Sequence, residues 1–178
     1  MLLAVDCGNT NIVFALYDGD IQRANWRIST DPKRSVDEYL VWLTQLMRLK
    51  SLAVDDVTDT IIASVVPEVQ PKLINLAARG FGIVPQVVGD SGIDLGIDIH
   101  IDRPDQAGAD RLVNAVAARD FHDLPAIILD FGTATTFDLI GKGGAYQGGI
   151  IAPGVNLSVE ALYMAAARLP RLAVEPWE

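Results

Sequence analysis

Residues 2–16 read LLAVDCGNTNIVFAL, and residues 127–140 read IILDFGTATTFDLI. Each stretch is an apolar run that ends in an aspartate, followed by a glycine, a small polar turn and a second apolar run. This pattern is typical of a buried β-hairpin, so it predicts that a strand, a turn and a second strand occur twice. The repeat predicts two related halves, which we expect to face each other across a cleft.

The two turns carry groups that bind phosphates and cations. Asp6 and Asp130 supply carboxylates, and the residues after them supply backbone N–H groups, glycines and hydroxyls. Such groups together hold a phosphate and its counter-cation. The same residues are also ordinary turn formers, because an aspartate stabilises a turn by accepting backbone N–H bonds. The duplication, more than either turn alone, favours a nucleotide site shared by the two hairpins.

Length and charge narrow the class of protein. The chain has 178 residues, 50% of them hydrophobic, and a formal net charge of −9. It can therefore bury a substantial core, as one large domain or two small ones. Its 14 Lys and Arg residues are scattered along the sequence, so we expect no direct nucleic-acid partner.

Two further features concern location and redox chemistry. We find no apolar run of membrane-spanning length and no basic leader before the first strand, so we expect no membrane association and a cytoplasmic protein. The single cysteine, Cys7, excludes an internal disulfide and a multi-cysteine metal site. We expect it to be a small buried residue rather than a nucleophile.

The rest of the chain alternates strands with helices, which is typical of an α/β fold. Besides the two hairpins, strands are expected over 22–28, 60–66, 84–88 and 148–151, with a half-exposed strand over 94–102 because that segment alternates strictly. Helices are expected over 35–49, before residue 80, from about 106 and over 156–168. The first helix begins with the capping-box spacing of Ser35 and Glu38.

Asp110 is a third candidate acid. It lies in the first turn of the helix expected from about residue 106, where the helix dipole favours an acid for structural reasons alone. Gly108 and Arg111 favour a functional interpretation. The glycine lets a ligand approach the helix N-terminus, and the arginine can bind a carboxylate or phosphate. Both interpretations stay open at this point.

Four segments in this order resemble the type III pantothenate kinase family. They are DCGNT at 6–10, GADRLVNAV at 108–116, DFGTATT at 130–136 and GGIIAPG at 148–154. The resemblance covers essentially the whole chain. It implies an α/β fold of two ribonuclease-H-like domains, as in actin, sugar kinases, acetate kinase and heat-shock chaperones, with ATP bound between them. In this chain the domains would be 1–120 and 121–178, the second of them incomplete.

The resemblance also implies an activity and its residues. The family transfers a phosphoryl group from ATP to pantothenate, the first step of coenzyme A biosynthesis. Asp110 would be the general base, Asp130 would bind K⁺ or NH₄⁺, and the pantothenate site would be lined by Gly108, Ala109, Asp110 and Arg111. Mg²⁺ would lie near Asp6, and ATP would be bound by Asp6, Cys7, Gly8, Asn9, Thr10, Asn11, Ile12, Val13 and Thr133.

Two departures from the family pattern affect these expectations. Ile101 stands where many members have a tyrosine that lines the pantothenate pocket, so one hydroxyl contact would be absent. Members also continue well past residue 178, so the helix over 156–168 would keep an uncovered apolar side, formed by Val159, Leu162, Tyr163, Ala166 and Leu169. We therefore expect a homodimer or other self-association.

Two alternatives to an active kinase remain. The family includes proteins described as accessory factors for transcriptional activation, which would act through partners. The chain would otherwise be an inactive, ATP-binding fragment.

Overall fold

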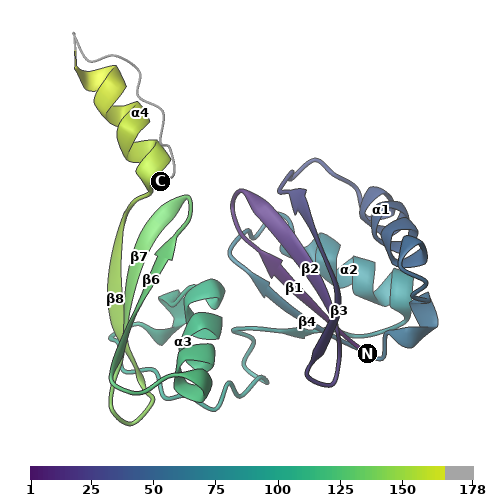
Figure 1. Ribbon diagram of the computed structural model, residues 1–178, viewed down its shortest axis with the longest axis horizontal. Coiled ribbons are helices and arrows are strands. Elements are labelled where there is room, and N and C mark those ends of the chain that lie inside the picture. Colours follow the sequence, from purple (N-terminus) through teal and green to yellow (C-terminus); the bar gives the residue numbers. More distant parts are fainter. Residues whose placement is uncertain (167–178) are drawn as a thin grey trace. The chain divides into compact units, whose positions relative to one another are not determined.

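The computed structural model describes residues 1–166, which form two compact units (Figure 1). The first unit contains residues 1–95 and 108–113, and the second contains residues 96–107 and the chain from 114 onward. The chain thus passes between the units at three points, whereas the sequence predicts a single boundary at residue 120. Compactness alone does not define a domain, so the domains 1–120 and 121–178 stay a prediction.

The first unit is built on a five-stranded mixed sheet in the order β3-β2-β1-β4-β5. An antiparallel meander is formed by β1 (Leu2–Cys7), β2 (Asn11–Asp18) and β3 (Ile21–Ser29). The sheet continues in parallel through β4 (Asp59–Ser64) and β5 (Gln86–Val87). The predicted first hairpin is confirmed, whereas the strands predicted over 60–66 and 84–88 are shorter than expected.

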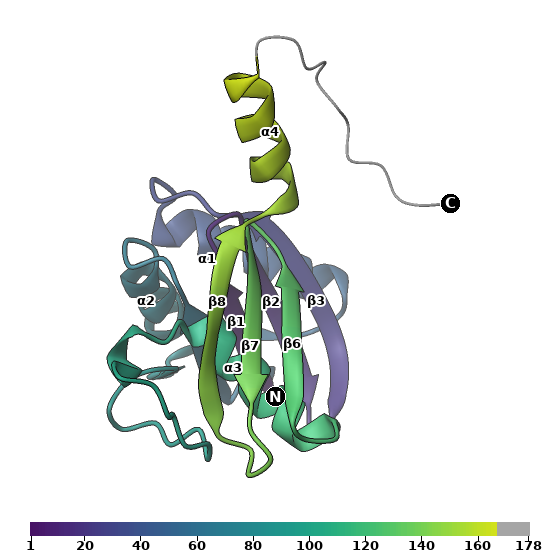
Figure 2. The same ribbon diagram turned by 90° about the vertical axis from the view of Figure 1, so that its left-hand side faces the viewer.

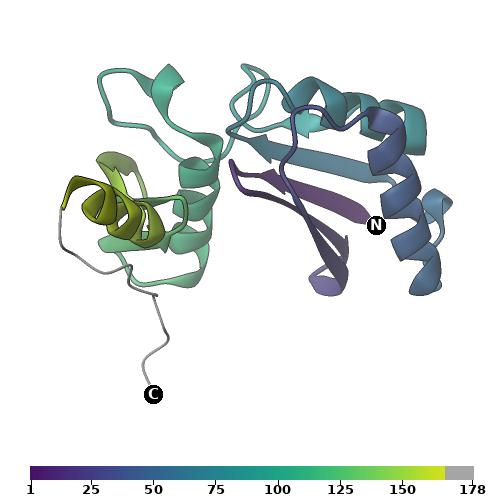
Figure 3. The ribbon, with the colours of Figure 1, turned by 90° about the horizontal axis from the view of Figure 1, so that it is seen from above.

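Two helices pack against this sheet, α1 (Val36–Leu49) and α2 (Gln70–Phe81), seen from above in Figure 3. The predicted capping box is present, because Glu38 N–H donates to Ser35 Oγ at 3.2 Å and Ser35 N–H donates to Glu38 Oε2 at 2.7 Å. The α2 helix ends at Gly82, which adopts the left-handed conformation that closes many helices. An ion pair of 2.7 Å between Arg79 and Asp37 joins α2 to α1.

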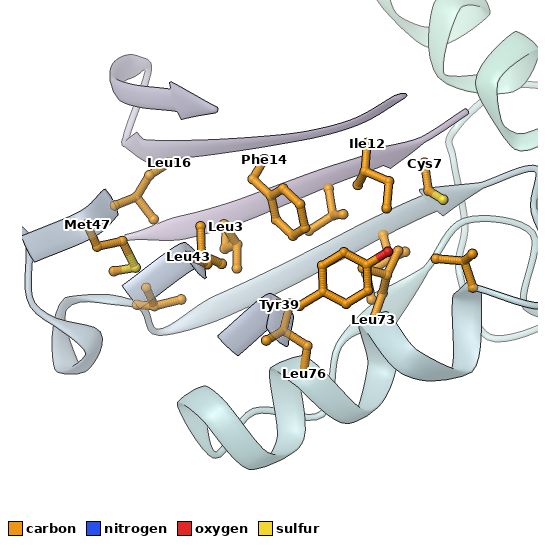
Figure 4. Packing of buried hydrophobic residues seen from close by; sticks show 14 of the residues in the cluster. Leu3, Cys7, Ile12, Phe14, Leu16, Tyr39, Leu43, Met47, Leu73 and Leu76 are labelled. Carbon is orange, nitrogen blue, oxygen red and sulfur yellow. The ribbon is translucent and has the colours of Figure 1, made fainter. Parts of the chain in front are cut away.

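The hydrophobic core of the first unit lies between these helices and one face of the sheet (Figure 4). Alternate side chains of β1 and β2 point into it, because successive residues of a strand face opposite sides. The ring centroid of Phe14 lies 5.5 Å from that of Trp42 and 6.4 Å from that of Tyr39. The side chain of Asp6 lies on the opposite face of the sheet from those of Val5 and Cys7, which are buried. The carboxylate at the end of β1 therefore lies on the face away from α1 and α2.

The capping box makes a prediction about stability. Replacing Ser35 with alanine removes the side chain that accepts the Glu38 N–H, so the free energy of unfolding should fall by about 1 kcal/mol. Urea unfolding followed by circular dichroism measures this change. Ser91→Ala, in an exposed turn, is the matched control and should leave the midpoint unchanged. An unchanged midpoint for Ser35→Ala would contradict the prediction.

The second unit contains a three-stranded antiparallel meander in the order β6-β7-β8 (Figure 2). Its strands are β6 (Ala126–Phe131), β7 (Ala134–Ile140) and β8 (Tyr146–Pro153). Its connectivity repeats that of β1, β2 and β3, which confirms the second hairpin and the internal repeat. Inside this unit Tyr146 Oη donates to Asp138 Oδ1 at 2.8 Å, and both side chains are buried.

The segment between the two meanders differs from its prediction in two ways. The strand predicted over 94–102 is wrong, because these residues form turns and only an isolated bridge joins Ile99 to Tyr146. Gly96 has a φ of 68°, which interrupts an extended backbone although the alternation continues through it. The helix α3 (Ala109–Phe121) begins later than expected, after the short 3₁₀ helix η2 (Pro104–Gln106). Another 3₁₀ helix, η1 (Val54–Asp56), precedes β4.

The last described helix is α4 (Val155–Ala165). Of the apolar side predicted to be uncovered, Leu162 and Tyr163 are 55% and 40% exposed, whereas Val159 and Ala166 are half-buried. The predicted helix end at Arg168, and Leu169, lie outside the described residues. Over the part of the chain that the structure describes, no helix is long and apolar enough to cross a membrane.

Candidate functional site

The first candidate loop follows β1 and leads into β2. Gly8 N–H donates to the Asn11 carbonyl at 3.0 Å, so the turn itself consists of Asn9 and Thr10. Both turn residues are exposed, as is Asp6. The side chains of Cys7 and Ile12 are buried in the core. Of the residues that the resemblance assigns to ATP, these two could therefore contact a ligand only through their backbone.

The side chain of Cys7 is part of the hydrophobic core. Burial raises the pKa of its thiol above the ordinary value, and the hydrogen bond with Ser64 offsets this only in part. A thiol with a raised pKa stays protonated at neutral pH and is a poor nucleophile. The Cys7 carbonyl accepts the Val65 N–H at 3.0 Å, which links the end of β1 to the residue after β4. The expectation that Cys7 is a small buried residue is confirmed.

The start of α3 lies at the same end of the first sheet. Gly108 accepts the first helical bond, from Leu112 N–H at 3.1 Å, so it precedes the helix rather than lying in its first turn. A Cβ atom at Gly108 would lie 3.7 Å from Cγ1 of Val65, the residue bonded to Cys7. Gly108 is therefore close to the carboxyl ends of the parallel strands β1 and β4. Ligands bind at such strand ends in open α/β sheets.

Asp110 is half-buried in the first turn of α3. Its Oδ1 atom accepts the Arg111 N–H at 2.8 Å. A Cβ atom at Gly108 would lie 2.5 Å from the same oxygen, so a side chain there would displace the carboxylate. Glycine at position 108 thus leaves room for the carboxylate of Asp110 in this position. The local bond supports the structural interpretation, and the partial exposure of Asp110 leaves the catalytic one open.

A pocket inside the first unit lies between the strands β1 and β2 and the helix α3. Its volume is about 260 Å³, and its lining includes Asp6, Val13, Ala63 and Val113. Most of the lining is apolar, and Asp6 contributes the only carboxylate among the lining residues. Val113 lies one helical turn after Asp110, on the same side of α3. The structure therefore brings Asp6 and the helix that carries Asp110 around one cavity.

The second candidate loop joins β6 to β7. Gly132 N–H donates to the Ala134 carbonyl at 2.9 Å, so the turn consists of Thr133 alone. Asp130 pairs with Thr136 across the hairpin. Asp130 and Thr133 are exposed, whereas Thr135 is buried. The loop thus offers one carboxylate and one hydroxyl to a ligand, and Thr135 serves the packing of the unit.

A larger pocket, of about 620 Å³, runs along β6 in the second unit. Asp130 lies at the end of this run, and polar groups come from Asn114 of α3 and from His122, the residue directly after α3. The spacing of His122 to other polar residues gives no indication that α3 lies beside β6, so only the structure could place it in this lining.

Ile101 also lies in the second unit. Its Cγ2 atom would lie 3.1 Å from a Cβ atom at Gly148, whose φ of 102° disfavours any other residue. Just before it, His100 N–H donates to the Tyr146 carbonyl at 2.8 Å. Ile101 is therefore fixed beside the start of β8 by backbone pairing, and it brings a hydrocarbon side chain where the resemblance implies a hydroxyl.

Asp6 suits a cation site that is completed by the phosphates of a bound substrate. In the described residues no group of three or more His, Cys, Asp or Glu side chains is arranged to hold a metal ion. Magnesium in kinase sites is commonly held by one or two carboxylates together with substrate phosphates. Asp6 is exposed at the end of β1 and supplies one such carboxylate.

Comparison with known proteins identifies the family. Residues 2–177 match the family model of type III pantothenate kinase. The chain belongs to this family. The type III pantothenate kinase of Paramagnetospirillum magneticum is 58% identical over 174 residues, covering 98% of the chain and 67% of that relative. The type III pantothenate kinase of Rhodospirillum rubrum is also 58% identical, covering 98% of the chain and 68% of its own length. The chain thus spans about two thirds of these relatives.

Solved structures agree with the fold. A protein described as a conserved Baf family transcriptional activator from Campylobacter jejuni superposes with a TM-score of 0.58 at 19% identity, over 99% of the chain and 68% of its own. The ethanolamine utilization protein EutJ from Carboxydothermus hydrogenoformans gives a TM-score of 0.52 at 15% identity, over 95% and 57%. At these identities the likeness shows the fold alone. It confirms an α/β fold with a mixed sheet.

Proposed function

We propose that this protein transfers the γ-phosphoryl group of ATP to pantothenate, giving 4′-phosphopantothenate and ADP. The match of residues 2–177 to the type III pantothenate kinase family carries the proposal. The geometry of the first unit supports it, because an exposed acidic loop and the start of α3 lie at the same strand ends. No observation on the described residues favours the role in transcriptional activation.

The loop between β1 and β2 would bind the ATP phosphates. The exposed turn of Asn9 and Thr10 presents polar side chains, and Gly8 keeps the backbone open to close approach. Asp6 would hold Mg²⁺ together with the phosphates, and the bound cation would neutralise charge that develops during transfer. Thr133, exposed in the second loop, would contribute a further hydroxyl to ATP.

Asp110 would act as the general base. The primary hydroxyl of pantothenate attacks the γ-phosphorus, the bond from that phosphorus to the bridging oxygen of ADP breaks, and the hydroxyl proton passes to a carboxylate. Phosphoryl transfer has a loose transition state and needs positioning more than covalent help, so one carboxylate is sufficient. Asp110 suits this role because its Oδ1 atom accepts the Arg111 N–H, and this hydrogen bond fixes the orientation of the carboxylate. Gly108, Ala109 and Arg111 would line the pantothenate site.

Asp130 would bind the monovalent cation, K⁺ or NH₄⁺. It is exposed at the end of β6, beside a turn that supplies hydroxyl and carbonyl oxygens. Such oxygen ligands suit a hard cation. We also propose a homodimer, which the exposed apolar side of α4 supports. Sedimentation over a range of concentrations tests this assembly.

The test of the proposed activity is an assay of this chain with MgATP and pantothenate in potassium buffer. We expect ADP and 4′-phosphopantothenate to form in equal amounts, measured by mass spectrometry. The control is 4′-deoxypantothenate, which lacks the attacking hydroxyl and should give no phosphorylated product. ATP binding without any transfer would instead identify an ATP-binding fragment, and ADP release that does not depend on pantothenate would identify an ATPase.

A further inference from the structure

In each hairpin of the repeat, the last residue of the turn accepts a backbone hydrogen bond from the residue that follows the third strand. Thr30 N–H donates to the carbonyl of Thr10 at 2.9 Å, and Gly154 N–H donates to the carbonyl of Thr133 at 3.1 Å. Thr30 is the first residue after β3, and Gly154 is the first residue after β8. They therefore occupy equivalent positions, each at the end of the third strand of its meander and against the turn of the hairpin.

At this position the first meander uses a side chain. Thr30 Oγ1 donates to the carbonyl of Gly8 at 2.6 Å, so Thr30 forms hydrogen bonds with the carbonyls of both Gly8 and Thr10. Further hydrogen bonds connect the segment around Thr30 to the rest of the first unit. Lys72 of α2 donates to the carbonyl of Arg34 at 3.0 Å, and Arg34 Nη1 donates to that of Ser29 at 2.7 Å. The loop after β3 is therefore fixed to α2.

In the second meander the equivalent residue is Gly154, which has no side chain. A Cβ atom at Gly154 would lie 2.5 Å from the carbonyl oxygen of Gly132 and would also overlap that of Thr133. Gly132 is the counterpart of Gly8 in the Asp-x-Gly pattern, so in both meanders the residue after the third strand lies against the carbonyl of this glycine and that of a later turn residue, Thr10 in the first and Thr133 in the second. Gly154 has a φ of −63°, so backbone conformation does not demand glycine there. Close packing against the turn does.

We propose that Thr30 and Gly154 are positioning residues that fix the peptide planes of the two ligand loops. A carbonyl held by a neighbouring donor prevents its peptide group from turning over, and the N–H groups of the loop are then presented in one orientation. Preorganised N–H groups bind an anion more tightly because less ordering accompanies binding. A threonine that merely stabilised a turn would affect unfolding alone.

The first experiment tests Thr30 without any ligand. Thr30→Val removes the hydroxyl and keeps the shape, so amide hydrogen exchange at Gly8 to Asn11 should become about tenfold faster in the whole chain, the size expected for one lost hydrogen bond. Thr30→Ser should restore the slow exchange. The matched control is Thr44→Val, which removes a hydroxyl bonded to the Leu40 carbonyl at 2.7 Å in α1 and should leave this loop unchanged. Unchanged exchange in Thr30→Val would overturn the proposal.

The second experiment measures the dissociation constant of MgATP and rests on the proposed function. Thr30→Val should weaken binding about tenfold, and Thr30→Ser should bind normally. Gly154→Ala should speed exchange at Gly132 to Ala134 and weaken MgATP by at least as much, because its Cβ must push a backbone carbonyl aside. If Thr30→Val binds MgATP as tightly as the unaltered chain, the positioning role is wrong. If the unaltered chain binds no MgATP, the proposed function is wrong. The hydrogen-exchange result still decides whether Thr30 and Gly154 hold the two loops in place.

Discussion

Asp110→Asn is expected to lower the turnover number for pantothenate by a factor of about 10² to 10⁴, the range typical of a lost general base. The amide cannot take the hydroxyl proton. Its oxygen can still accept the Arg111 N–H, which Asp110 Oδ1 accepts at 2.8 Å. The start of α3 should therefore keep its conformation, and MgATP should bind almost as well as before. Steady-state kinetics and the dissociation constant of MgATP, measured on the same preparation, give both numbers.

Asp120→Asn is the matched control for this substitution. Asp120 lies on the same helix and is exposed, where it pairs with Arg119 at 2.8 Å, so its loss should leave turnover unchanged. Asp110→Ala provides a second comparison, because it removes the acceptor as well as the base. If Asp110→Asn were as active as the unaltered protein, or if activity fell only in step with melting temperature, Asp110 would be a structural helix residue.

Asp130→Ala is expected to abolish the dependence of turnover on K⁺ or NH₄⁺ and to remove most of the activity. Removing one electrostatic group from an active site commonly costs about 10²-fold in turnover, and we expect a loss of that size. Asp130 is exposed at the end of β6, so the change should leave the fold intact. Turnover measured as KCl is replaced by NaCl at constant ionic strength tests the dependence.

The control for Asp130 is Asp123→Ala. Asp123 is likewise exposed and lies shortly before β6, so it matches the change in charge without touching the loop. The control should keep the full response to potassium. Undiminished turnover of the unaltered protein in sodium alone would show that Asp130 binds no required monovalent cation.

The sequence predicted those elements whose signals are local. The hairpin turns at Gly8 and Gly132 and the capping box at Ser35 appear in the structure where expected, because turn and cap chemistry depends on neighbours in the chain. The segment around Gly96 was misjudged for the opposite reason. Its apolar and polar residues alternate, but backbone conformation at a glycine is not encoded in alternation, and the partner of Ile99 is distant in sequence.

The same distinction between local signals and contacts distant in sequence applies to the candidate site. Local patterns predict the candidate acids Asp6, Asp110 and Asp130, and their roles stay predictions. The space that Gly108 leaves beside Asp110 Oδ1 depends on the path of the backbone before α3, which no local pattern predicts. The contact of Thr30 cannot be predicted from a local pattern, because its bond to Gly8 joins residues that are adjacent only after three strands have paired. Positions of this kind need the register of a sheet, which pattern analysis of one sequence does not provide.

The outer edge of β6 affects how solutions of this protein behave. In the described residues β6 has a strand on one side only, whereas β1 has β4 on the corresponding side. Ile127 and Phe131 on β6 are 65% and 68% exposed, and such an edge is a template for strand addition. A net charge of −9 keeps molecules apart at neutral pH. That repulsion vanishes near the isoelectric point of about 4.6 and is screened by salt. We therefore expect concentrated samples to associate through this edge more readily near pH 4.6 and at high ionic strength than at neutral pH and low salt.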